Sequence, residues 1–209
     1  MASLKRRSPV LLPGEGAETA LVGGWEVVLR HEGESELLPV VVDFSHKAKW
    51  MVQGRDLKEV LGDVSQVAST PGGAHWEKGC LVMRLGFRQA IIWVLGERDP
   101  LDIKGSGFTD VTDGSVLLGI GGPAAFAIGE KLTALDLLRK DLEPPFVLQG
   151  PFAHVPCTLA VLKTSENSGA FMVACSRGYG QDMVHAVMDA GEEWGLRPGG
   201  ERAFQRFLG

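Results

Sequence analysis

Short runs with the hydrophobic pattern of β-strands recur along the whole chain. Each run is rich in aliphatic or aromatic residues and is bounded by glycine, proline or polar residues that favour turns. The runs are shorter than helices of ordinary length. They predict strands at 24–31, 37–44, 48–54, 80–86, 90–96, 115–121, 156–163 and 170–176.

Helical periodicity is confined to three segments, 54–64, 122–135 and 179–195. The second segment places Pro123 where the first residue of a helix is expected. Because strands outnumber helices and do not alternate with them regularly, the pattern predicts an α+β fold with largely antiparallel sheets. No repeat or linker divides the 209 residues, so we expect one domain, or two small lobes that share a core.

Charge and the amino terminus exclude several classes of protein. The formal net charge is −5, and the one basic cluster, Lys5 to Arg7, lies at the terminus, so we predict no nucleic-acid partner. No apolar run is long enough to span a membrane, and the first sixteen residues lack a signal-peptide core. We therefore expect a cytoplasmic protein.

The candidate chemistry in the motifs is weak. Cys80, Cys157 and Cys175 are too few and too far apart for a disulfide framework or a zinc site, and each lies beside an apolar run that predicts a buried, reduced thiol. The five histidines show no metal-ligand spacing, so we predict no metal. "GIGGPA" at 119–124 loosely matches a dinucleotide-binding turn, but Pro123 removes an N–H that would face a phosphate, which favours a tight turn before a helix.

The order of several segments resembles the glycine cleavage system T-protein family, the aminomethyltransferases that bind tetrahydrofolate. The resemblance runs from about Ser8 to the carboxyl end and is carried by "SPVLLPGEGAETALVGGWEVVLRH", "VVVDFSHKAKWMVQGRDLKEVL", "PGGAHW", "TDVTDGSVLLGIGGPAAFAIGEKL" and "VMDAGEEWGLRPGG". It implies antiparallel sheets around a central cavity, with the helices at 122–135 and 179–195 on the outer faces. It also implies that residues 1–209 are one such domain without the smaller carboxyl-terminal barrel of full-length members.

The site residues that the resemblance implies depart from the family pattern. Two aspartates precede the family's strand that corresponds to 90–97, and one of them positions the folate amine; here Arg88 and Gln89 occupy these positions. Neither side chain is a carboxylate, so we expect the family's transfer chemistry to be lost. Ser168 stands opposite the family's pterin-holding glutamate, with Glu166 two residues away, and Trp76 replaces a pocket tyrosine. These five residues are the predicted cofactor-binding set, and we assign no catalytic residue.

The gamma subunit of heterotetrameric sarcosine oxidase, which resembles a shortened T-protein domain of about this length, is similar to the later half of the chain, whereas the first ninety residues look more like the T-protein itself. The likeness to the gamma subunit implies a non-catalytic partner of flavin-bearing subunits. Two hypotheses therefore stand. The first is a binding or accessory protein, whose remnant pocket holds tetrahydrofolate or a related one-carbon carrier, or which offers a surface to a lipoyl carrier protein or flavin oxidase subunits. The second is an active aminomethyltransferase that transfers a one-carbon group to tetrahydrofolate. Under either, the protein is expected to form homo- or hetero-oligomers. A carboxylate that points into the central cavity would favour the enzyme.

Overall fold

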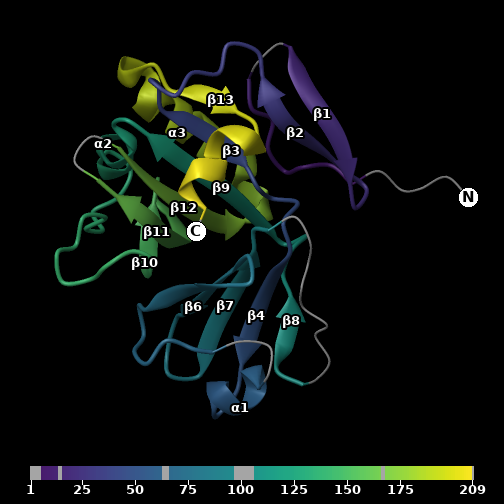
Figure 1. Ribbon diagram of the computed structural model, residues 1–209, viewed down its shortest axis with the longest axis vertical. Coiled ribbons are helices and arrows are strands. Elements are labelled where there is room, and N and C mark those ends of the chain that lie inside the picture. Colours follow the sequence, from purple (N-terminus) through teal and green to yellow (C-terminus); the bar gives the residue numbers. More distant parts are fainter. Residues whose placement is uncertain (1–5, 14–15, 63–65, 97–105, 166–167, 209) are drawn as a thin grey trace, which may run out of the picture.

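Two sheets packed face to face form the body of the protein, and a separate hairpin extends from one side (Figure 1). The computed structural model describes residues 6–13, 16–62, 66–96, 106–165 and 168–208. The sheets are antiparallel except for one strand pair, which confirms the predicted fold class.

The larger sheet has six strands in the order β10-β11-β12-β9-β3-β13. Only β13 runs parallel to its neighbour, β3. In that order the strands are Phe146–Phe152, Val155–Thr164, Gly169–Ser176, Ser115–Gly122, Val40–Asp43 and Arg197–Gly199.

The smaller sheet has five antiparallel strands in the order β5-β6-β7-β4-β8. They are Ala74–Glu77, Cys80–Arg84, Gln89–Val94, Lys49–Gln53 and Phe108–Asp110. An isolated bridge between Gly73 and Phe146 joins the start of β5 to the edge of the larger sheet.

Short helices cover the outer faces of both sheets. On the larger sheet lie α2 (Ala125–Glu130) and α3 (Gly180–Gly191), and on the smaller sheet lies α1 (Leu57–Leu61). The remaining elements are α4 (Glu201–Phe204) and three 3₁₀ turns, η1 (Arg177–Tyr179), η2 (Glu192–Trp194) and η3 (Gln205–Phe207). None of the helices in the described residues has the length and apolarity that a bilayer crossing demands.

The apolar core is divided into three layers by the two sheets. The outer layer beneath α2 and α3 contains Phe126, Phe171 and Val187, and the layer beneath α1 contains Leu57 and Ile92. The middle layer lies between the sheets and brings together side chains of both: Phe44, Leu81, Met83, Trp93, Leu117, Met172 and Phe204. The sheets' inner faces thus meet in one apolar interface, as the alternation of buried residues along the strands requires.

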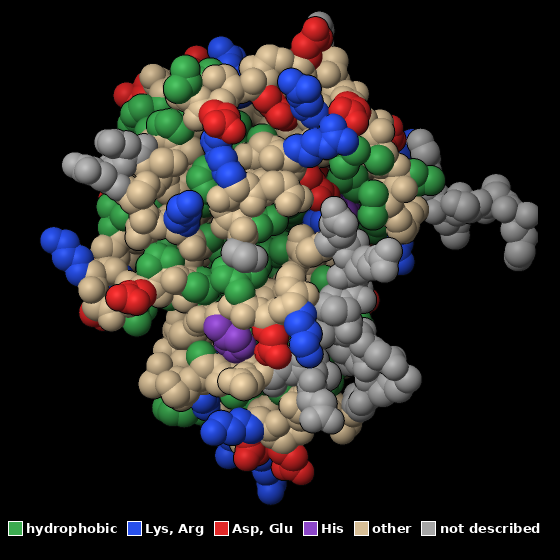
Figure 2. All heavy atoms as spheres, in the orientation of Figure 1, with side chains coloured by type: hydrophobic (Ala, Val, Ile, Leu, Met, Phe, Trp, Pro, Cys, Tyr) green, Lys and Arg blue, Asp and Glu red, His purple; other side chains and the backbone are tan. Residues whose placement is uncertain are grey.

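The hairpin of β1 (Ala17–Val22) and β2 (Trp25–His31) is attached to the body through polar contacts. The Glu34 carboxylate accepts hydrogen bonds from the backbone N–H of His31 at 2.7 Å and of Gly200 at 2.6 Å. Arg202 of α4 forms an ion pair with Glu18 of β1 at 2.9 Å. Charged side chains of both signs are interspersed on this part of the visible face, at the top of Figure 2.

The segment around α4 also contacts the β3–β4 turn, which joins the two sheets. Glu201 is buried, and its carboxylate lies 2.6 Å from His46 Nε2 and 3.0 Å from Lys47 Nζ. Burial alone would raise the pKa of Glu201, but the hydrogen bonds and positive charges of His46 and Lys47 outweigh it and hold the pKa below its ordinary value. The ionised carboxylate therefore links α4 to the β3–β4 turn.

All eight predicted strands are confirmed. The predicted start of the second helix at Pro123 is wrong, because β9 continues to Gly122, where it still pairs with Gly169. The chain then turns through Ala124, which has a left-handed φ of 58°, and α2 begins at Ala125. The prediction missed β1, β5, β8, β10, β13 and α4.

Candidate functional site

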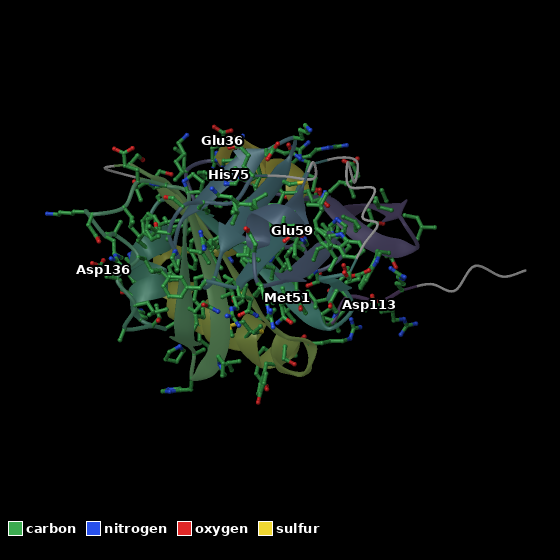
Figure 3. All side chains as sticks on the ribbon, turned by 90° about the horizontal axis from the view of Figure 1, so that it is seen from below. Glu36, Met51, Glu59, His75, Asp113 and Asp136 are labelled. Atoms are coloured by element: carbon green, nitrogen blue, oxygen red, sulfur yellow. The ribbon has the colours of Figure 1, made fainter. Side chains whose placement is uncertain are left out.

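A cavity of about 390 Å³ lies where the inner faces of the two sheets separate. On one side it is lined by Met51 of β4 and Ile91 of β7, and on the other by strands β10 to β12 of the larger sheet. Seen from below, Met51 lies toward the middle of the molecule and Asp113 toward its side (Figure 3). A larger hollow of about 500 Å³ lies between β2, β13 and α3, away from the sheet interface.

Strand register places the lining side chains in two facing rows. Met51 is directly opposite Ile91 in the pairing of β4 with β7. On the larger sheet, Thr158 of β11 is opposite both Gln149 of β10 and Ala174 of β12. Because directly opposed residues share a face of an antiparallel sheet, each row presents its side chains on one face.

The described residues that line the cavity carry no charge. They are Met51, Ile91, Val111, Ser115, Gln149, Gly150, Pro156, Cys157, Thr158, Ala174, Cys175 and Ser176. Hydroxyl and carboxamide groups can hydrogen-bond a ligand here, whereas general acid–base catalysis at neutral pH requires an ionisable group. The ionisable groups of the described lining are the thiols of Cys157 and Cys175, and it includes no carboxylate or imidazole.

A group of charged residues lies beside this neutral lining. Lys49 precedes Met51 by two residues on β4, and its Nζ donates to the backbone oxygens of Ser45 at 2.8 Å and Lys47 at 2.9 Å. Burial lowers the pKa of Lys49 to about 8, although the carboxylates of Asp43, Asp110 and Asp113 act to raise it. The backbone N–H of Lys49 donates to Thr112 Oγ1 at 2.9 Å, which links β4 to the segment between Val111 and Ser115 of the lining.

Of the four predicted site residues that the structure describes, Gln89 is the one that contacts the cavity lining. It begins β7 on the same face as Ile91, and its Nε2 lies 3.3 Å from Met51 Sδ. Arg88 precedes it in the β6–β7 turn, where its side chain is exposed and its backbone oxygen accepts the Gly54 N–H at 3.1 Å. The adjacent polar residues therefore separate, one toward the cavity and one toward solvent.

Trp76 lies on the inner face of the smaller sheet but outside the cavity lining. It pairs with Leu81 of β6, which pairs in turn with Trp93 of β7, so the three side chains form a row across the sheet. Trp76 is half-buried and packs against the middle core layer. Its position two strands from β7 corresponds to roughly 10 Å. Its role in ligand binding remains a prediction.

Ser168 lies at the opposite end of the β11–β12 hairpin from the cavity. Its backbone oxygen accepts hydrogen bonds from the Ser165 N–H at 2.9 Å and the Ser165 hydroxyl at 2.5 Å, which close the hairpin turn. From Thr158 at the cavity to Thr164 at the turn the strand rises by roughly 20 Å. Glu166 lies outside the described residues. The structure thus does not bring the four described members of the predicted set together around one cavity.

The sequence offered little signal for the residues that do line the cavity. Met51, Ile91 and Ala174 belong to apolar strand runs that any buried strand would show, and Gln149 and Thr158 are single polar residues. Only the register of five strands brings these residues into facing rows. In the described part of the chain, no group of three His, Cys, Asp or Glu side chains is arranged to hold a metal ion.

Comparisons with known proteins show the fold. No protein-family model and no curated protein matches the sequence. A chain of the heterotetrameric sarcosine oxidase from Corynebacterium sp. U-96, in complex with pyrrole 2-carboxylate, aligns with a TM-score of 0.63 at 16% identity, over 77% of this chain and 87% of that chain. The glycine cleavage system aminomethyltransferase T from Bartonella henselae aligns with a TM-score of 0.63 at 15% identity, over 92% of this chain and 58% of that chain.

The two structures are those that the sequence resemblance points to, and they confirm the predicted fold. This chain spans little more than half of the aminomethyltransferase and most of the sarcosine oxidase chain. At these identities the likeness establishes a shared fold, and function has to be argued from the site itself.

Proposed function

We propose that this protein is a non-catalytic binding or accessory protein of one-carbon metabolism, built on the fold of the aminomethyltransferases. The observation that carries the proposal is the neutral lining of the inter-sheet cavity in the described residues. A protein that binds or assembles can use such a cavity without further chemistry, whereas a transferase needs a positioned acid or base.

The two residues at the family's aspartate positions support the loss of catalysis. Gln89 lies beside the cavity residue Met51, but its carboxamide is neutral over the physiological pH range. Arg88 is exposed on the adjacent turn, and its guanidinium cannot accept a proton. Neither of the two positions therefore carries a carboxylate.

A folate or a related one-carbon carrier is the proposed small-molecule ligand, and its affinity is expected to be weak. The cavity volume of about 390 Å³ is at the low end of the range for small-molecule sites. The cavity offers hydrogen bonds from Gln149, Thr158 and Ser176, without a charge that could anchor the glutamate tail of a folate. The proposed macromolecular partners are flavin oxidase subunits or a lipoyl carrier protein.

Calorimetry and a transfer assay test the proposal together. The purified protein is titrated with tetrahydrofolate and is also incubated with an aminomethyl-lipoyl carrier, with a competent aminomethyltransferase as the positive control. We expect no transfer and weak or undetectable folate binding. Measurable transfer would instead support the active aminomethyltransferase. Micromolar folate affinity that is lost in Trp76→Ala would overturn the assignment of a non-catalytic protein that binds folate weakly.

Two aspartate variants extend this test. Arg88→Asp is expected to leave transfer undetectable, because position 88 faces solvent on the β6–β7 turn. Gln89→Asp places a carboxylate next to Met51, and it is the matched variant on the cavity side. Transfer in Gln89→Asp but not in Arg88→Asp would show that only the missing charge separates this site from an active one.

Assembly is tested separately by light scattering of the protein alone and mixed with flavin oxidase subunits or with a lipoyl carrier protein. The accessory hypothesis predicts a stable complex with one of the two. A strict monomer in all mixtures would contradict it.

A further inference from the structure

Two of the three cysteines, distant in sequence, come together on neighbouring strands. Thr158 of β11 pairs with Ala174 of β12, and extending this antiparallel register by one position sets Cys157 opposite Cys175. Directly opposed residues in antiparallel strands have Cα atoms about 4.5 to 5.5 Å apart. That spacing falls within the range of about 4.4 to 6.8 Å that a disulfide requires.

The two thiols also contact each other. The Cys157 thiol shares a side-chain hydrogen bond with the sulfur of Cys175, and its Sγ lies 3.9 Å from the backbone oxygen of Phe152. The hydrogen bond between the sulfurs raises the pKa of Cys157, an effect that burial reinforces, and lowers the pKa of Cys175 against the effect of burial. Cys175 is thereby the better nucleophile, and Cys157 holds the proton.

The pair lies near the end of the sheet and not in its middle. Cys157 follows the exposed Pro156 near the start of β11, and Cys175 precedes the exposed Ser176 at the end of β12. Each cysteine is 7% exposed, and both residues border the inter-sheet cavity while packing with the outer core layer. A small oxidant can reach this position by a local opening of the strand ends, without global unfolding.

We propose that Cys157 and Cys175 form a redox-active dithiol, which a peroxide converts to an intramolecular disulfide in the folded protein. The Cys175 thiolate attacks the O–O bond of hydrogen peroxide, which gives a sulfenic acid and releases hydroxide. The Cys157 sulfur then attacks the Cys175 sulfur, forms the S–S bond and displaces water. The two thiols lose two electrons, and the peroxide is reduced to two molecules of water. The inference goes beyond the proposed function and does not depend on it.

Thiol counting and peptide mapping test the dithiol in the unmodified chain. The reduced protein is exposed to a few equivalents of hydrogen peroxide under native conditions, alkylated, and digested with trypsin. Lys78, Lys163 and Arg177 place the three cysteines in separate tryptic peptides. We expect free thiols to fall from three to one, and the peptides of Cys157 and Cys175 to appear as one species, 2 Da lighter than their sum.

Serine variants show which of the three cysteines take part in the disulfide. Cys80 lies on the smaller sheet, so Cys80→Ser is the matched control and is expected to form the same disulfide, with its two thiols falling to none. Cys157→Ser and Cys175→Ser each lack one sulfur of the pair, so each is expected to stop at a sulfenic acid that dimedone traps and to form no intramolecular disulfide. Three thiols that persist in the folded wild-type protein, or a cross-link that involves Cys80, would overturn the proposal.

Discussion

Lys49 is fully buried at the junction of the two sheets, although a lysine carries a charge at neutral pH. Two backbone oxygens satisfy two of its ammonium protons, and no carboxylate among the described residues forms an ion pair with it. The cost of moving the charge out of water exceeds the attraction of Asp43, Asp110 and Asp113, which is why the pKa falls from 10.5 to about 8. Lys49 is therefore expected to make the folded protein more stable, not less stable, as the pH rises above about 8.

The free energy of unfolding is expected to rise between pH 8 and pH 10.5. Over this range the folded protein has released the Lys49 proton while the unfolded chain still holds it, so the unfolded state binds more protons and stability increases with pH. The contribution amounts to about 2 to 3 kcal/mol between pH 7 and pH 10. Urea denaturation at both pH values, on the wild-type protein and on Lys49→Met, measures it.

Lys49→Met keeps a side chain of similar length without a titrating group, so its unfolding free energy should lack this rise. The difference between the two proteins isolates Lys49 from the other groups that titrate above pH 9. Equal slopes in the two proteins would show that Lys49 keeps its ordinary pKa.

At the scale of elements, the contact of α2 with the larger sheet depends on a residue without a side chain. Gly169 begins β12 opposite Gly122, and a Cβ added at Gly169 would lie 2.1 Å from Cε2 of Phe126 on α2. The Phe126 ring has little freedom to move, because it stacks against Phe171 with ring centroids 6.1 Å apart. One methyl group would therefore displace the helix.

Gly169→Ala is expected to destabilise the fold by about 1 to 3 kcal/mol, the usual cost of overpacking a dense core. Gly178→Ala is the control, because a Cβ at position 178 meets no atom within 4 Å. It should change stability by less than about 0.5 kcal/mol. Thermal or urea unfolding of both variants measures the difference in stability. Equal stabilities would mean that α2 can shift to make room for the methyl group without destabilising the fold.

The elements also show what the sequence could predict and why the rest was missed. Long apolar runs such as β11 and β12 were predictable, because strands buried on both faces need many apolar residues. The missed strands are short or polar: β8 and β13 have three residues each, and β10 contains Gly150 and Pro151. These segments become strands by pairing with a neighbour, which local pattern does not encode.

The candidate site was predictable only in part, for a related reason. The sequence singled out Arg88 and Gln89 together, but the structure has Arg88 in the β6–β7 turn, exposed to solvent, and Gln89 at the start of β7, beside Met51. The position of Ser168, remote from the cavity, follows from the length of the β11–β12 hairpin. The contact between Cys157 and Cys175 depends on strand register, which sequence spacing does not reveal.

For the molecule as a whole, the middle core layer determines how much space is left for a ligand. It joins the two sheets through large side chains from both, so most of the space that a ligand would need is already filled. What remains is the cavity at the margin of this layer. A macromolecular partner is therefore expected to bind mainly to the outer surface of the molecule.

The hairpin of β1 and β2 is expected to unfold locally while the rest of the molecule stays folded. Every β1 residue except Ala20 is exposed, and among the described strands β1 pairs only with β2, whereas β12 is buried and paired on both sides. Deuterium is expected to enter amides of 17–22 in seconds to minutes and those of 169–176 only near the rate of global unfolding. Arg202→Ala, which removes the ion pair with Glu18, should speed exchange in the hairpin alone. Mass-spectrometric exchange kinetics would read both segments from one sample, and slow exchange in 17–22 would reveal a molecule that covers the hairpin in solution.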